Sequence, residues 1–233
     1  MRAAQRFLAA ILAFAAVPAP AQETGTLVTH RAAQIDGRGR DAARLTMERF
    51  MACAVSRQSG RARNLTRLPI DSPDYQRSFR SLYDTIGDVC LGSNGELSFS
   101  EGLFRGGLFQ ALYAREFSDN GPTDFSAVTN SGYLQLYTSP LSDQARTALA
   151  LEQFGECVSR ADAAGVRNLL RQLPGSAGER EAINALRPRF AACIPQNETI
   201  QFSASVLKGA LAEGIYRLSA AARGGAQIVE ASE

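Results

Sequence analysis

Phe50-Met-Ala-Cys53 and Arg63-Asn-Leu-Thr-Arg67 return later in the chain, in the same order, as Phe154-Gly-Glu-Cys157 and Arg167-Asn-Leu-Leu-Arg171. The two copies stay in register without a gap across both motifs, and a second cysteine follows in each copy. Counting outward from that second cysteine aligns further pairs: Phe99 with Phe202, Arg105 with Lys208, Gly106 with Gly209, and Tyr113 with Tyr216. Self-similarity of this extent predicts a duplicated folding unit.

Apolar residues recur at helical spacing through the first copy. A first helix is expected over residues 41–57, with Asp41 as its N-cap. A short helical turn follows and ends at Pro69, because proline cannot continue a helix. The next helix is expected over residues 73–90, where a proline occupies the favoured first position.

The second copy repeats these helices with small differences. Its long helix is expected over residues 177–193, where Pro188 should kink or split it. Gly106 and Gly209 lie inside the last helix of each copy, and they predict that another helix approaches closely there. Serines are placed to cap the starts of later helices: Ser100, Ser142 and Ser203.

We therefore expect an all-α protein of two tandem homologous helical units, with about four helices and one disulfide each, packed as a pseudo-symmetric pair. The alternative is two separately mobile domains. The expected segments are a signal peptide at 1–21, an N-terminal segment at 22–40, unit 1 at 41–117, a linker at 118–140, unit 2 at 141–222 and a loosely held polar tail at 223–233. Within the linker, residues 133–137 have a short strand-like pattern.

The cysteine spacing selects one disulfide pairing. Cys53 and Cys90 are separated by almost the same length as Cys157 and Cys193, so the simplest pairing places one bridge in each unit. The alternatives, metal ligation and thiol redox chemistry, would need closely spaced Cys or His pairs or a Cys-x-x-Cys motif. Neither is present, so no metal and no cofactor are expected.

The first residues indicate export. A basic start is followed by a short apolar run and then by Ala19-Pro-Ala21, the small-residue pattern of a signal cleavage site. The apolar run is too short to span a bilayer, and no later segment is long enough, so no transmembrane segment is expected after cleavage. The alternative is a retained N-terminal anchor. The arginine-rich, alanine-rich composition suggests a bacterium, and hence the periplasm or secretion.

Charge argues against a nucleic-acid partner. Once Arg2 and Arg6 leave with the signal peptide, Lys and Arg equal Asp and Glu in number. A nucleic-acid-binding protein needs a surplus of clustered positive charge to displace counterions from phosphates.

Catalytic motifs are few. His30 is the single histidine and lies outside the repeated region, so Ser-His-Asp and Cys-His mechanisms have one poor candidate. Ser205-Val-Leu-Lys208 matches the Ser-x-x-Lys nucleophile motif, but the accompanying motifs of penicillin-recognising enzymes are missing. In the first copy Gly102 replaces Ser205, which weakens the match.

Polar residues shared by both copies are the remaining candidates for ligand binding: Arg63, Asn64, Arg105, Arg167, Asn168 and Lys208. One hypothesis is structural: asparagines cap helix ends, and basic side chains bind helix C-terminal carbonyls or pair with Glu48 and Glu152. The other is that the basic residues line a cleft between units and grip carboxylates or phosphates.

The sequence favours a non-enzymatic exported interaction or binding protein with an envelope protein as partner. The alternative is a periplasmic carrier that holds a small ligand in a pocket between the units. A hydrolase using carboxylates such as Glu48 and Glu152 comes third, because equivalent positions in a repeat usually share a structural role.

Overall fold

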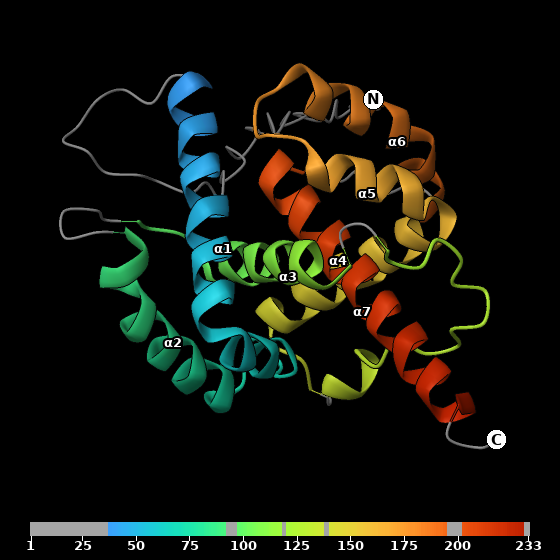
Figure 1. Cartoon of the computed structure of the whole chain (residues 1–233), viewed down its shortest axis with the longest axis horizontal. Coiled ribbons are helices and arrows are strands. Elements are labelled where there is room, and N and C mark those ends of the chain that lie inside the picture. The colour runs from blue at the N-terminus through green and yellow to red at the C-terminus, as the bar shows by residue number, and fades with distance from the viewer. Residues whose placement is uncertain (1–36, 92–96, 118–119, 138–139, 195–201, 231–233) are drawn as a thin grey trace, which may run out of the picture.

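The computed structural model describes residues 37–91, 97–117, 120–137, 140–194 and 202–230, which are helical and contain no β-strand (Figure 1). The elements are α1 (Gly37–Thr66), α2 (Pro73–Leu91), α3 (Glu101–Phe117), the 3-10 turn η1 (Leu134–Leu136), α4 (Asp143–Ala161), α5 (Ala163–Arg171), α6 (Ala177–Cys193) and α7 (Ala204–Glu230). The predicted signal peptide, His30 and most of segment 22–40 lie outside the described residues. No described helix is long and apolar enough to cross a membrane.

The helices α3 and α7 lie at the centre of the fold and pack directly against each other (Figure 1). On one side α1 packs on α3 and carries α2, and on the other α4 and α5 pack on α7 and contact α6. One continuous apolar core runs through both groups of helices. Its members include Phe50, Leu82, Phe104, Phe154 and Leu211.

Serine hydroxyls define where most helices begin. Each accepts a hydrogen bond from a backbone N–H of the first turn, which would otherwise lack a partner. These serines cap α2, α3, α4, α6 and α7 and are Ser72, Ser100, Ser142, Ser176 and Ser203. The predicted caps at Ser100, Ser142 and Ser203 are thus confirmed.

The first helix differs from its predicted start. α1 begins at Gly37, so the predicted N-cap Asp41 lies inside the helix, where its carboxylate pairs with Arg44 at 3.1 Å. The helix continues past a non-helical residue, Gln58, to the predicted short turn before Pro69. In α6, Pro188 does not split the helix, which runs over the predicted range.

The last helix is longer than predicted. Instead of a loose tail after residue 222, α7 continues to Glu230. Arg223 supplies a physical reason, because its guanidinium lies 4.1 Å from the ring centroid of Phe117 and donates to the Glu116 carbonyl oxygen at 2.9 Å. Contacts with α3 therefore hold the helix beyond the predicted end.

The linker contains no strand at residues 133–137, where the prediction was wrong. Leu134–Leu136 form a 3-10 turn instead. Tyr133 is buried, and the Tyr137 hydroxyl donates to Glu152 Oε1 at 3.1 Å. The alternating pattern reflects these two anchored tyrosines, because no described strand is available as a pairing partner.

Paired glycines allow α7 to touch the backbones of two other helices. A Cβ placed on Gly106 of α3 would lie 2.7 Å from the Cα of Gly209 in α7. A Cβ on Gly155 of α4 would lie 2.0 Å from the carbonyl oxygen of Ala210. The predicted close approach at Gly106 and Gly209 is confirmed, and its partners are each other.

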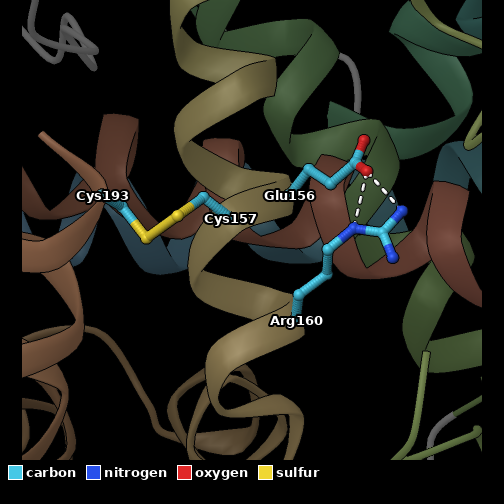
Figure 2. Close-up of a disulfide and its surroundings, with 4 residues drawn as sticks. All are labelled: Glu156, Cys157, Arg160 and Cys193. Carbon is cyan, nitrogen blue, oxygen red and sulfur yellow. Dashed lines mark hydrogen bonds and ion pairs between the residues drawn. A yellow bond between two sulfur atoms is a disulfide. The ribbon is translucent and has the colours of Figure 1, made fainter. Parts of the chain in front are cut away.

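Two disulfides join α2 to α1 and α6 to α4. Cys53 in α1 is bonded to Cys90 in α2. Cys157 in α4 is bonded to Cys193 in α6, and Figure 2 shows this second disulfide. These are the pairs that the spacing predicted. Their separations of 37 and 36 positions each correspond to about 4 kcal/mol of stabilisation in the chain-entropy model.

We predict that Gly106→Ala destabilises the fold by about 1–3 kcal/mol, the usual cost of overpacking a core. The new methyl group would meet the Gly209 backbone, which cannot move as a side chain can. Gly87→Ala in α2 is the matched control, since nothing lies within 4 Å of its added Cβ; it should gain about 0.5–1 kcal/mol. Urea denaturation with intact disulfides measures both, and equal stabilities would contradict the prediction.

Candidate functional site

Ionisable side chains are buried around the crossing of α3 and α7. They are Arg105, Glu152, Glu179, Lys208 and Glu213. A charge removed from water costs several kcal/mol unless it is paired and hydrogen-bonded. The contacts of this ionic cluster therefore decide which side chains are available to a ligand.

Arg105 is 3% exposed and its guanidinium bridges three elements. It donates to the carbonyl oxygens of Thr66 and Leu68 at 3.3 and 3.0 Å, just past the end of α1. It also donates to Glu152 Oε1 at 3.2 Å and to Glu213 Oε1 at 3.0 Å. Arg105 therefore joins the end of α1 to α4 and α7.

Lys208 of α7 is 1% exposed. Like Arg105, it binds both a carboxylate and a carbonyl oxygen near a helix end. Its Nζ donates to Glu48 Oε1 at 2.7 Å and to the Gln172 carbonyl oxygen at 2.9 Å, just past the end of α5. Glu179 lies 3.6 Å from the same Nζ and also accepts from Arg44. The structural hypothesis, basic side chains bound to helix-end carbonyls and to Glu48 and Glu152, describes these contacts.

Glu152 and Glu213 form a buried carboxyl pair whose two pKa values are shifted in opposite directions. Burial raises the pKa of Glu152, and the neighbouring Glu213 raises it further. Burial alone would raise the pKa of Glu213 as well, but Arg105 and Arg217 outweigh it and lower that pKa. Glu152 Oε2 has no hydrogen-bond partner among the described residues, so no contact of that oxygen stabilises the ionised form.

A cavity of about 600 Å³ lies beside this cluster. Its wall comes from α3, α4 and α7, from the start of α2 and from the turn before it. The apolar members are Ile70, Leu103, Ala148, Leu151, Val206 and Ala210. The polar and charged members include Gln76, Glu101, Arg105, Asp143, Gln144 and Glu213. Asp143, Gln144 and Thr147 are solvent-exposed, so the cavity opens to the surface along α4.

Glu101 is the charged group of this cavity that lacks a cation. Its Oε2 accepts hydrogen bonds from Gln76 Nε2 at 2.7 Å and from Gln144 Nε2 at 3.1 Å. No described Lys or Arg pairs with it. The Glu101 side chain is thus held in place by two neutral amides, unlike Glu213, which is bound to two arginines.

The six predicted ligand-binding residues do not gather in one place. Arg105 lines the large cavity, whereas Lys208 borders a separate space of about 30 Å³. Arg63 pairs with Glu116 at 2.8 Å, and Arg167 donates to the carbonyl oxygens of Gly121 and Pro122. Both asparagines, Asn64 and Asn168, are solvent-exposed. The side-chain oxygen of Asn168 accepts a hydrogen bond from the Gln172 side-chain amide.

Several residues of the ionic cluster escaped the sequence comparison. Glu179 and Glu213, together with the adjoining Arg217, differ between the two similar stretches of sequence, so a search for shared residues removes them. A different signal was present for Glu213, because it lies among Leu211, Ala212 and Ile215 on the apolar side of a helix. A charge at such a position predicts a buried ion pair.

We predict that Glu152→Gln weakens the pH dependence of stability. The native protein keeps a proton on Glu152 that the unfolded chain releases above the ordinary pKa of 4.5. Stability therefore falls as pH rises above that value, by about 1.4 kcal/mol per pH unit for one proton. Glutamine mimics the protonated acid and removes this slope, so the variant gains relative stability toward alkaline pH.

Urea denaturation between about pH 5 and pH 8 compares the two proteins over the range where this linkage acts. Carbon-13 NMR of the Glu152 side chain follows the protonation directly. An identical slope in both proteins, with Glu152 ionised at neutral pH, would show that the carboxyl pair holds no proton.

Comparison with protein-family models finds no matching family, and searches of curated proteins and of solved structures find no match either. The contacts, burial and charges of the cavity and its surroundings are the basis from which a function is inferred.

Proposed function

We propose that this chain is an exported, non-enzymatic binding protein that holds a small organic molecule in the cavity between α3, α4 and α7. The cavity carries the proposal. Its volume of about 600 Å³ falls in the range of small-molecule pockets, about 300–1,000 Å³. Its wall is largely apolar with polar groups at a few points, which is the usual composition of such sites.

The cavity lies between two copies of one helical unit, if the duplication is as we infer. In that scheme α1–α3 correspond to α4–α7, with α1 matching α4 and α5 together. Two observations support it. Each group contains one disulfide between equivalent cysteines. The contacts are also reciprocal, because Arg105 pairs with Glu152 while its counterpart Lys208 pairs with Glu48.

This scheme explains why one half of the fold has a large cavity while the equivalent space in the other half is nearly filled. Beside Lys208, the side chain of Arg44 reaches Glu179 and the Ser205 hydroxyl, and only about 30 Å³ remains free. The position equivalent to Arg44 is Ala148, which lines the large cavity. A small side chain thus leaves open the space that an arginine fills in the other half.

The charges of the cavity indicate the kind of ligand. Arg105 is already bound to Glu152 and Glu213, so it offers little free positive charge. Glu101 is held by two amides and pairs with no described cation. A carboxylate beside an apolar wall favours a molecule with an apolar body and an amine or ammonium group.

Export belongs to the same proposal. The two disulfides favour an oxidising compartment, which would be the periplasm or the medium in a bacterium. The signal peptide on which the expectation first rested lies outside the described residues.

The small-ligand carrier was the alternative in the sequence analysis. No contact among the described residues favours the protein-binding function that the sequence placed first, or the hydrolase that it placed third. Glu48 and Glu152, the suggested hydrolase pair, bind different cations, and Glu152 does not line the large cavity. Binding of an envelope protein stays a prediction, which a pull-down with intact disulfides would test.

Octylamine, octanol and octanoate test the cavity with one apolar chain and three different head groups. Calorimetric titration should give the tightest binding for octylamine and the weakest for octanoate. Glu101→Gln should weaken octylamine binding about tenfold, equivalent to about 1.4 kcal/mol, and leave octanol unchanged. Equal binding of the amine and the carboxylate would contradict the proposed ligand class.

Ala148→Arg should abolish binding of all three probes. It places an arginine in the large cavity, as Arg44 does in the equivalent space beside Lys208. Ala150→Arg is the matched control, since Ala150 is solvent-exposed on the same helix and does not line the cavity. Binding that survives Ala148→Arg, or that Ala150→Arg reduces equally, would place the ligand elsewhere.

A further inference from the structure

A second depression lies away from the large cavity, between the end of α1 and α7. This groove of about 260 Å³ is lined by three arginines, Arg63, Arg67 and Arg217, and by the turn at residues 130–132. Phe109 and Tyr216 form its aromatic part. No Asp or Glu is among its described lining residues. The groove shares no lining residue with the large cavity.

The arginines of the groove retain unused hydrogen-bond donors. Arg67 is solvent-exposed, and its guanidinium makes no hydrogen bond or ion pair with a described residue. Arg63 uses its Nε for Glu116 Oε1. Arg217 uses Nε and Nη2 for Glu213 and the Thr66 carbonyl oxygen. The remaining N–H groups of all three are free to bind an acceptor.

Positive charge is in excess around the groove. The carboxylate of Glu116 offsets Arg63, whereas Glu213 is shared between Arg217 and Arg105. Arg67 has no carboxylate partner among the described residues. Guanidinium groups in this arrangement bind carboxylates and phosphates through pairs of parallel hydrogen bonds.

The equivalent place in the other half contains the acceptors that the groove lacks. Arg167, which matches Arg63, donates to the carbonyl oxygens of Gly121 and Pro122 and to the Tyr113 hydroxyl. Tyr113 matches Tyr216, which borders the groove. The linker thus supplies oxygen atoms to Arg167, while Arg63 binds Glu116 through its Nε and no described linker carbonyl oxygen occupies its remaining donors.

We infer that the groove binds an oxyanion, a carboxylate or phosphate group, between Arg63, Arg67 and Arg217. The oxyanion takes the place that linker carbonyl oxygens occupy at Arg167. The Asn130 side-chain oxygen accepts from the Gly132 N–H, which leaves the Asn130 amide N–H groups as further donors. The site differs from the proposed amine-binding cavity in location and in the sign of its ligand.

Inorganic phosphate and acetate are the probes, titrated at constant ionic strength with chloride as reference. We expect saturable binding, detected by calorimetry and by shifts of the Gly132 amide NMR signal. Whichever probe binds more tightly identifies the oxyanion. Arg67→Gln should weaken that binding at least about tenfold, because it removes charge-assisted hydrogen bonds. The variant should fold normally, since the Arg67 side chain makes no hydrogen bond to a described residue.

Arg57→Gln is the matched control, because it removes one exposed arginine from α1, the helix that ends just before Arg67, at a position outside the groove. It should leave binding within about twofold of the unmodified protein. An equal loss in both variants, binding no tighter than chloride, or full binding in Arg67→Gln would each overturn the inference. Ala148→Arg should leave oxyanion binding intact, so failure of the cavity proposal and failure of this one are distinguishable.

Discussion

The backbone contact between Gly106 and Gly209 sets the geometry of the whole molecule. It lets the backbones of α3 and α7 approach directly, since a Cβ at either glycine would meet the other backbone. Arg105 and Lys208 directly precede these glycines. The crossing therefore places one buried cation on each side of the contact between α3 and α7. Arg105 pairs with Glu152 there, and Lys208 pairs with Glu48. Without the close approach, neither ion pair could form across the two groups of helices.

The buried cations then impose a second constraint, because a buried charge is costly unless it is paired. Arg105 pairs with two carboxyl groups and donates to two carbonyl oxygens, while its Nε has no hydrogen-bond partner among the described residues. Such a network adds little net stability compared with an apolar core of the same shape. Its effect is to fix the register of α3 against α4 and α7, which keeps the adjoining cavity wall in place.

The sequence predicted what depends on local chemistry or on the repeat. The serine caps, the helix over 177–193, the cysteine pairs and the meeting of Gly106 with Gly209 belong to this group. The end of α7 and the 3-10 turn were missed because contacts with distant residues decide them. The cavity could not be predicted, since it results from a side chain that is small at Ala148 and from neighbours on three helices.

Comparison of the two halves argues that the open cavity is a built feature of the fold. In one half Arg44 pairs with Glu179. By the proposed correspondence, Ala148 replaces the arginine and Gln76 replaces the glutamate. Loss of the arginine alone would have left a carboxylate without its partner, at a cost of several kcal/mol. Both charges are absent together, and the neutral Gln76 binds Glu101 instead. By that correspondence, the group of helices with the cavity has neither member of the Arg44–Glu179 ion pair, and the Glu101 carboxylate in its wall is held by neutral amides.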